Sequence, residues 1–93
     1  MTFEEFIQSV SNSQPPKTTP LLQSLWYDKK GDWNKSHDIA QDIHTPDGSW
    51  VHAYLHRKEE DIWNADYWYR RAGRTRPSVS LDKEWESIVK AFL

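Results

Sequence analysis

Apolar side chains recur three and four positions apart along most of the chain, which is the spacing of one face of an α-helix. Phe3, Phe6, Ile7 and Val10 follow this spacing near the N-terminus, and no stretch alternates with period two over more than a few residues. The pattern therefore predicts an all-α fold, a small bundle of five to six short helices. The expected helices span residues 2–10, 20–30, 33–43, 49–59, 62–72 and 81–92.

Residues that start and stop helices stand at the ends of these segments. Thr2 and Glu5 fit a capping box, in which each side chain satisfies a backbone N–H of the first turn. The other expected N-terminal caps are Thr19, Asp32, Asp61 and Ser80, and the expected terminators are Gly31 and Gly73. Residues 45–49 (Thr-Pro-Asp-Gly-Ser) are of the types found in turns, so we expect the chain to reverse there before the fourth helix.

Ninety-three residues suffice for one domain, and the chain divides into four segments within it. These are an N-terminal helix and linker (1–18), a first helical hairpin (19–44), a second hairpin (45–77) and a C-terminal helix (78–93). Leu, Ile, Val and Phe make up less than about a fifth of the chain, whereas there are six Trp and four Tyr. We therefore expect an aromatic core, with inner-face rings at Trp26, Trp33, Trp68, Tyr69 and Trp85.

The net charge and the absence of cysteine exclude several kinds of partner and of functional site. A net charge of −2 gives the whole molecule no electrostatic attraction to nucleic acid or to an anionic membrane. The absence of cysteine excludes disulfides, thiolate metal sites and cysteine nucleophiles. Acidic residues near the start and the lack of a long apolar run favour a cytoplasmic protein with no membrane partner. No motif in the sequence predicts a bound cofactor.

The chain contains an internal repeat with a period of 29 residues. Residues 31–36 align with residues 60–65, which brings acidic caps, large apolar residues and small residues into register. Ser24 then matches Ala53. Each unit is expected to be a helix, a tight turn and a second helix, with small residues where the two backbones approach. Glu60 stands where the first unit has a glycine.

Over residues 21–77 these hairpins resemble the tetratricopeptide class of helical repeats. The second unit carries the fuller pattern of small, large, small, aromatic, small and proline positions, at Ala53, Ile62, Ala65, Tyr69, Ala72 and Pro77. The run 65–73, with its Trp-Tyr-Arg-Arg-Ala segment, is similar to the ending of Sel1-like repeats. The block 49–59 also resembles small bacterial proteins of uncharacterised function. The repeat resemblance implies two stacked hairpins with flanking helices that close the ends.

All four histidines lie between residues 37 and 56. His52 and His56 are four residues apart, a spacing at which two imidazoles on one helix face can share a metal ion. An antiparallel third helix could bring His37 toward His56, or His44 toward His52. Three interpretations are open: a structural polar network, a small-ligand or metal site made of His37, His52 and His56, and a minor catalytic role.

A second cluster combines aromatic side chains with arginine. Trp63 and Tyr67 lie four residues apart, and residues 70–76 contain four arginines and no acid. This combination can bind an acidic peptide, and it also fits a helix end beside a second buried aromatic stripe. The expected protein-binding residues are Trp50, Tyr54, Arg57, Trp63, Tyr67, Arg70, Arg71 and Arg74.

The repeat resemblance implies a non-enzymatic scaffold that binds a protein or peptide, by analogy of fold alone. The alternative is a small-ligand or metal-binding protein that uses His37, His52 and His56. Nucleic acid is a weaker partner candidate, and a two-repeat stack is compatible with a homodimer formed through an apolar end.

Overall fold

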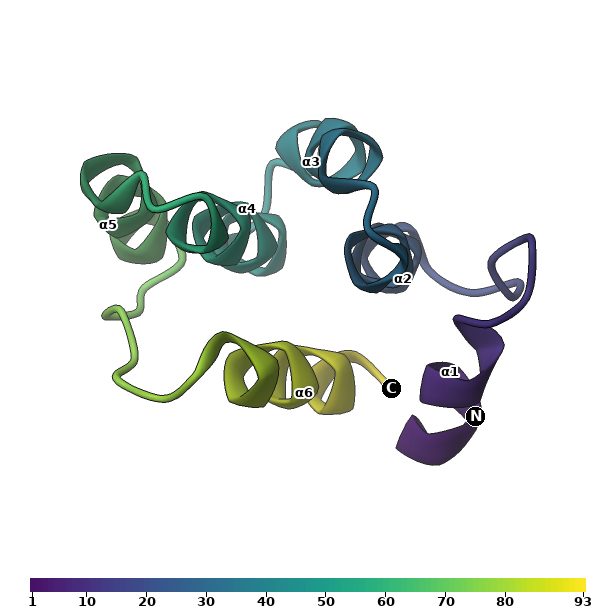
Figure 1. Ribbon diagram of the computed structural model, residues 1–93. Coiled ribbons are helices and arrows are strands. Elements are labelled where there is room, and N and C mark those ends of the chain that lie inside the picture. Colours follow the sequence, from purple (N-terminus) through teal and green to yellow (C-terminus); the bar gives the residue numbers. More distant parts are fainter.

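Six α-helices follow one another along the chain, and the computed structural model describes all residues from 1 to 93 (Figure 1). The helices are α1 (Phe3–Ser9), α2 (Pro20–Lys30), α3 (Trp33–Gln41), α4 (Pro46–Lys58), α5 (Ile62–Arg71) and α6 (Leu81–Phe92). No strand is present, which confirms the all-α prediction. None of the six helices is both long enough and apolar enough to cross a membrane.

Most of the expected caps form. Thr2 and Glu5 make the reciprocal capping box of α1. The side chains of Thr19, Asp32 and Ser80 each accept a hydrogen bond from a backbone N–H in the first turn of α2, α3 and α6. Asp61 occupies the N-cap position of α5, but its side chain makes no capping hydrogen bond.

α4 begins at Pro46 rather than at Ser49, so the predicted turn over 45–49 is wrong. Thr45 caps the helix by accepting a hydrogen bond from the Gly48 N–H at 3.0 Å, and Pro46 takes the first helical position, where its missing N–H costs nothing. Gly48 is buried in this first turn, and a Cβ there would lie 2.0 Å from the carbonyl oxygen of Ile43. The glycine therefore permits a close backbone approach inside a helix.

The helices pair as two antiparallel hairpins, α2 with α3 and α4 with α5. In the first hairpin, Ser24 Oγ donates to the carbonyl of Ser36 at 2.7 Å, and both residues are fully buried. In the second hairpin the matching residues are Ala53 and Ala65, which are also fully buried. Small side chains thus lie where the two backbones of each hairpin meet, as the repeat predicts.

The two hairpin turns have the same backbone geometry. Gly31 has a φ of 97°, and Glu60, 29 residues later, has a φ of 66°. The next N–H in each turn reaches back to a helix carbonyl: Asp32 to Tyr27 at 2.9 Å and Asp61 to His56 at 3.0 Å. The sequence repeat therefore corresponds to a structural repeat that includes its turn.

α4 is the central helix of the fold (Figure 1). α3, α5, α6 and α2 all contact it, and every residue from Gly48 to His56 is buried. α6 lies across the face formed by α2 and α4, on the side away from α3 (Figure 1). α5 packs on α4 at one end of the array, so its outer face has no helix against it.

The core is aromatic, as the composition predicts. Trp26, Tyr69 and Trp85 are at most 2% exposed. Trp85 anchors α6 by donating its indole N–H to the carbonyl of Leu25 at 3.0 Å, and Phe6 of α1 packs on it at 5.9 Å between ring centroids. The other two rings expected inside, Trp33 and Trp68, are partly buried; they pack against the core and also stack on histidines.

Candidate functional site

Three of the four histidines meet between α3 and α4. His52 and His56 lie one turn apart on α4, with ring centroids 4.7 Å apart. The antiparallel packing of α3 brings His37 to both of them, at 4.6 Å from the His52 ring and 5.2 Å from the His56 ring. One ring nitrogen from each residue can be chosen so that all three atoms lie within 4.8 Å of one another. The structure therefore brings together the three histidines that the sequence singles out.

A direct hydrogen bond joins two of the rings. The Nε2 atoms of His37 and His52 are 2.9 Å apart, so one of them carries the proton that the other accepts. In a tetrahedral zinc site with Zn–N bonds of about 2.0–2.1 Å, two ligand nitrogens lie about 3.4 Å apart. The observed spacing is close to this value, and a metal ion would take the place of the shared proton.

Two tryptophans form the walls of the cluster. Trp33 stacks on His37 with centroids 4.8 Å apart, and Trp68 stacks on His52 at 4.0 Å. Trp33 is fixed in place by a hydrogen bond from its indole N–H to the carbonyl of Leu55 at 2.9 Å. These contacts hold two of the imidazole rings in defined orientations, which reduces the entropy lost on binding a ligand.

Burial disfavours the charged form of two of the rings. His52 is 6% exposed, and its burial, with the neighbouring His56 and His37, lowers its pKa to about 3. Burial and His56 also lower the pKa of His37, although Asp38 and Glu59 oppose this effect. A neutral imidazole has a free lone pair on one nitrogen, which is the form that binds a metal ion.

The third ring, His56, contacts polar groups on its outer side. Its Nδ1 lies 2.6 Å from a carboxylate oxygen of Glu59, and its Nε2 lies 3.4 Å from the side-chain nitrogen of Asn64. Histidines that ligate metals commonly donate their second N–H to a carboxylate in this way, which fixes the ring orientation. Glu59 and Asp61 form a second possible oxygen-donor group with His56, on the exposed rim.

His44 lies outside the cluster. It follows the end of α3 and lines a separate pocket together with His52. The fourth histidine thus makes a useful control for the other three.

The eight residues expected to bind a protein do not form one continuous exposed surface. Trp50 is 7% exposed and Tyr54 is 2% exposed, because α6 covers the face of α4 that carries them. Trp50 packs on Phe92, and the Tyr54 hydroxyl donates to Asp28 at 2.7 Å. The prediction that these two rings line a binding surface is therefore wrong.

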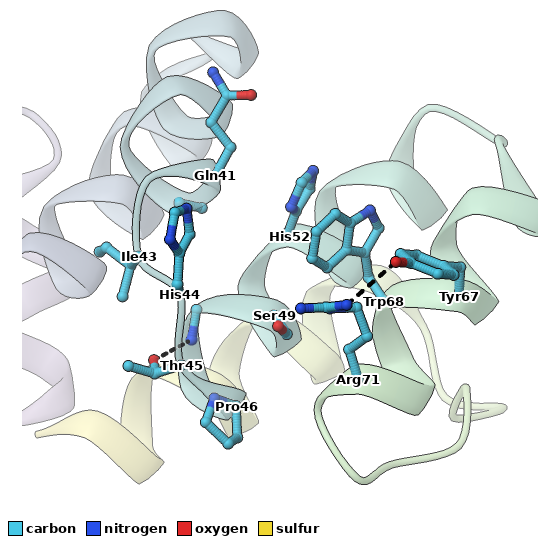
Figure 2. A pocket seen from close by; sticks show the side chains of 12 residues that line it. Gln41, Ile43, His44, Thr45, Pro46, Ser49, His52, Tyr67, Trp68 and Arg71 are labelled. Atoms are coloured by element: carbon cyan, nitrogen blue, oxygen red, sulfur yellow. Dashed lines mark hydrogen bonds between the residues drawn. The ribbon is translucent and has the colours of Figure 1, made fainter.

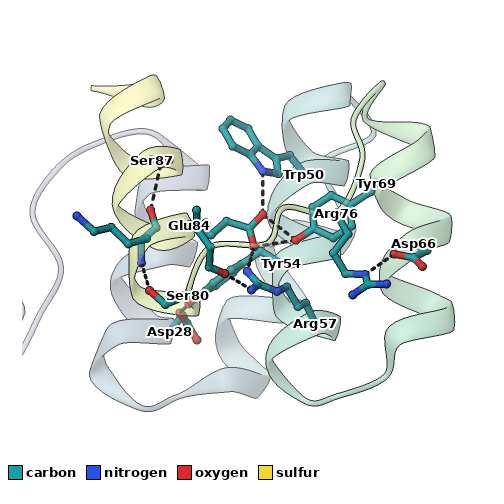
Figure 3. Close-up of polar contacts among 12 residues, drawn as sticks. Asp28, Trp50, Tyr54, Arg57, Asp66, Tyr69, Arg76, Ser80, Glu84 and Ser87 are labelled. Atoms are coloured by element: carbon teal, nitrogen blue, oxygen red, sulfur yellow. Dashed lines mark hydrogen bonds and ion pairs between the residues drawn. The ribbon is translucent and has the colours of Figure 1, made fainter.

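Arg57 belongs to the same buried region. Its guanidinium donates to Glu84 of α6 at 2.8 Å and to the carbonyl of Val79, and its side chain is 15% exposed (Figure 3). Arg74 lies over the Trp50 ring, with 3.4 Å between the guanidinium carbon and the ring centroid. Arg57 therefore joins α4 to α6 and is not available to a partner, while Arg74 is exposed and packs on Trp50 of α4.

The remaining predicted residues lie on the outer face and end of α5. Trp63 is 81% exposed and Tyr67 is 38% exposed, while Arg70 and Arg71 are also exposed. Arg71 contacts Tyr67 and Trp68 through cation–π interactions. The exposed aromatic and basic surface is therefore confined to α5 and is smaller than the sequence predicts.

Comparisons with protein-family models, with curated proteins and with solved structures found no match. The resemblance to tetratricopeptide and Sel1-like repeats therefore stays a prediction. The site is interpreted from its own chemistry.

Sequence reasoning missed two buried acids that organise the interior. Glu84 of α6 is 2% exposed and accepts hydrogen bonds from Tyr69, Arg57 and Trp50 (Figure 3). Asp28 of α2 is also 2% exposed and accepts from Tyr54 and from Lys58. These contacts join helices far apart in the sequence, and no local pattern marks either residue. The pairing of Trp33 with His37 could have been found, because the two residues are four apart on one helix.

Proposed function

We propose that the protein binds one divalent transition-metal ion, with Zn²⁺ as the representative ion, through His37, His52 and His56. The observation that carries the proposal is the convergence of three imidazoles whose candidate ligand nitrogens lie within 4.8 Å of one another. Imidazole nitrogen suits zinc, copper and nickel, whereas magnesium and calcium prefer oxygen ligands. The proposal assigns binding, and no reaction, to this site.

Two features of the surroundings support metal binding. The depressed pKa values of His37 and His52 mean that few protons compete with a metal ion at neutral pH. Trp33, Trp68 and Glu59 already hold the three rings, so little ordering is required when the ion binds. Three histidine ligands leave a fourth position for water or another ligand.

The experiment is a calorimetric titration of the metal-free protein with Zn²⁺, repeated on His37→Ala, His56→Ala and His44→Ala variants. We expect a 1:1 complex in the wild type and at least a tenfold weaker affinity when His37 or His56 is replaced. The His44→Ala variant serves as the matched control and is expected to bind like the wild type. Circular dichroism checks that each variant is folded.

Bound zinc should also stabilise the fold. At a free concentration of one hundred times Kd, a ligand that binds only the native state adds about 2.7 kcal/mol to the free energy of unfolding. The proposal would be overturned if Zn²⁺ produced no heat of binding and no rise in melting temperature. An equal loss of affinity in the His44→Ala variant would also overturn it. In those cases the three rings form a structural polar network.

A second candidate function is the binding of an acidic peptide by the outer face of α5. The observation in its favour is the 81% exposure of Trp63, because an indole left so far in water offers a large apolar area to a partner. Arg70 lies two turns further along the same helix and supplies positive charge. This is the remaining part of the scaffold function that the repeat resemblance implies.

The test is a calorimetric titration with a synthetic peptide rich in Asp and Glu, because its signal does not depend on the Trp63 ring. Binding is expected to weaken at least tenfold in both Trp63→Ser and Arg70→Glu variants. A wild type that shows no saturable heat of binding, or variants that bind as well as it does, would exclude this surface. Sedimentation velocity on the free protein tests the alternative that a second copy covers Trp63.

A further inference from the structure

A pocket of about 500 Å³ lies beside the histidine cluster and opens to solvent (Figure 2). Its walls are the end of α3 with the loop that follows, the first turn of α4, and the side of α5 that carries Trp68 and Arg71. His52 is shared by the pocket and the histidine cluster, since it lines the pocket and also contacts His37. No Asp or Glu side chain lines the pocket, whereas Arg71, His44 and His52 do.

Arg71 is the only fully charged group in this pocket, and it has no carboxylate partner. Its one hydrogen bond within the protein is the weak contact from Nη1 to the Tyr67 hydroxyl at 3.3 Å. The guanidinium packs on the Trp68 ring at 5.3 Å and on the Tyr67 ring at 5.8 Å. Figure 2 shows its side chain extended toward Ser49. The arginine is thus held in place with most of its N–H donors unused.

Two polar side chains in the wall are more than nine-tenths buried and have unused polar atoms. Ser49 is 7% exposed, and its hydroxyl makes no hydrogen bond with the protein; in Figure 2 it faces the guanidinium of Arg71. His52 is 6% exposed, and its Nδ1 has no partner, because the bond to His37 uses Nε2. Neither atom is sealed from solvent, since Trp26 Nε1 is the one fully buried side-chain polar atom without a partner, so both atoms are available to a ligand that enters the pocket.

The position at the start of α4 adds to the attraction for negative charge. Thr45, Pro46, Gly48 and Ser49 all belong to its cap or first turn and line the pocket. The N-terminus of a helix carries a partial positive charge that favours anions, although Asp47 lies in the same turn and the N–H groups of Gly48 and Ser49 already bond to Thr45. This effect supports the two observations above and is not needed to carry them.

We propose that this pocket binds a small oxyanion, a carboxylate or phosphate group, between the guanidinium of Arg71 and the hydroxyl of Ser49. Arginine forms paired hydrogen bonds with both kinds of group because its planar fork matches two of their oxygens. The partly apolar wall, with Ala40, Ile43 and Trp68, leaves room for a small organic part attached to the anion. This site goes beyond the metal site and does not depend on it.

The test uses metal-free protein in the presence of a chelator, so that its result is independent of zinc binding. ¹⁵N-labelled protein is titrated separately with inorganic phosphate and with acetate, and the Arg71 Nε–H and the Ser49 amide are followed by NMR. We expect saturable shifts of these signals with at least one of the two ions, with a Kd on the order of millimolar or lower. Comparison of the two titrations identifies which oxyanion the pocket prefers.

Three variants of the site and one control variant make the assignment specific. Arg71→Gln is expected to weaken binding at least tenfold, and Arg71→Lys several-fold, because lysine keeps the charge but loses the fork. Ser49→Ala is expected to weaken binding several-fold. Arg70→Gln is the matched control, since Arg70 precedes Arg71 on the same helix but does not line this pocket, and it should bind like the wild type.

Two results would overturn the proposal. One is the absence of saturable shifts up to about 50 mM of either ion, well beyond millimolar affinity. The other is an equal loss of affinity in the Arg70→Gln and Arg71→Gln variants, which would indicate general attraction to a basic surface. Arg71 is exposed, so its replacement should leave the fold intact, and a thermal melt of each variant checks this.

Discussion

The Nε2 atoms of His37 and His52 lie 2.9 Å apart, in a region where the pKa of His52 is lowered to about 3. The bond forms only while at least one of the rings is neutral, because a nitrogen that carries a proton cannot accept another. The rings that face His52 are His37 and His56, and both oppose a positive charge on it. The cluster is therefore a place where the fold depends on protonation.

The metal-free protein is expected to lose stability as pH falls below about 6.5. The unfolded chain takes up a proton on His52 near its ordinary pKa of 6.5, whereas the folded chain does not until about pH 3. Stability from this group is thus complete above about pH 6.5 and is lost between there and about pH 3, by up to about 1.4 kcal/mol per pH unit. Urea unfolding at several pH values measures the slope.

The comparison that isolates His52 uses the range from pH 6.5 to pH 5, where carboxylates contribute less. A His52→Leu variant is expected to have a shallower slope than the wild type, and a His44→Leu variant is expected to keep the wild-type slope. Equal slopes in all three proteins would contradict the assignment to His52.

Glu60 adopts a left-handed backbone conformation, with a φ of 66°, in the turn between α4 and α5. A side chain costs about 1–2 kcal/mol in this conformation, and the matching turn between α2 and α3 has Gly31. Glu60→Gly is therefore expected to raise the free energy of unfolding by about 0.5–1 kcal/mol, after the greater freedom of glycine in the unfolded chain is counted. Urea unfolding at pH 7 measures the change.

Glu60→Ala is the control for this prediction, because alanine removes the carboxylate but keeps the Cβ. It should leave the stability within about 0.5 kcal/mol of the wild type. Stabilisation by alanine equal to that by glycine would mean that the charge of Glu60, and not its backbone, is unfavourable.

Much of the fold follows from local features of the sequence. Helical spacing and caps such as Thr19 and Ser80 act within a few residues, so five of the six helix starts could be predicted closely. The start of α4 could not, because Thr-Pro-Asp-Gly suits both a turn and a capped helix, and only the approach of Ile43 to Gly48 decides between them.

The sequence predicted the histidine cluster better than the other sites, because the cluster depends on contacts that are close in the sequence. His37, His52 and His56 could be grouped because their spacing and a short antiparallel connection bring them together. The burial of Trp50 and Tyr54 could not be seen, since it depends on α6 lying across α4, a contact between residues about thirty positions apart. The oxyanion pocket likewise needs Ser49 and Arg71 from different helices.

Glu84 is expected to be the most sensitive polar residue of the interior. It is 2% exposed, pairs with Arg57 at 2.8 Å and accepts from Tyr69 at 2.7 Å. Glu84→Gln keeps the shape but leaves Arg57 without a counter-charge, and removing one partner of a buried pair costs about 3–5 kcal/mol. Denaturant unfolding and the change in melting temperature measure this loss.

Asp82, two residues earlier on α6, is the matched control. Its side chain is 90% exposed and lies 3.6 Å from Lys29, so Asp82→Asn is expected to cost less than about 1 kcal/mol. Similar small losses for both variants would show that Arg57 finds other partners when Glu84 is neutral.

Zinc and an oxyanion are expected to strengthen each other's binding if both proposals hold. His52 lines the pocket while its Nε2 faces His37, so a metal ion on Nε2 would fix the remaining ring proton on Nδ1 and make it a donor. The charge of the ion beside the pocket acts in the same direction. Because coupling between two ligands is reciprocal, phosphate should tighten zinc binding by the same factor by which zinc tightens phosphate binding.

Calorimetry of each ligand with and without a saturating concentration of the other measures both factors. We expect equal factors of about 5 or more, a typical size for such coupling. In the Arg71→Gln variant the anion binds at least tenfold more weakly, so the same phosphate concentration should change the zinc affinity much less than in the wild type. The effect of phosphate on zinc in solution is corrected with a small-molecule chelator titrated in parallel. Weaker zinc binding in the presence of phosphate would mean that the two ligands compete for His52, since a single imidazole would then have to turn from one site to serve the other.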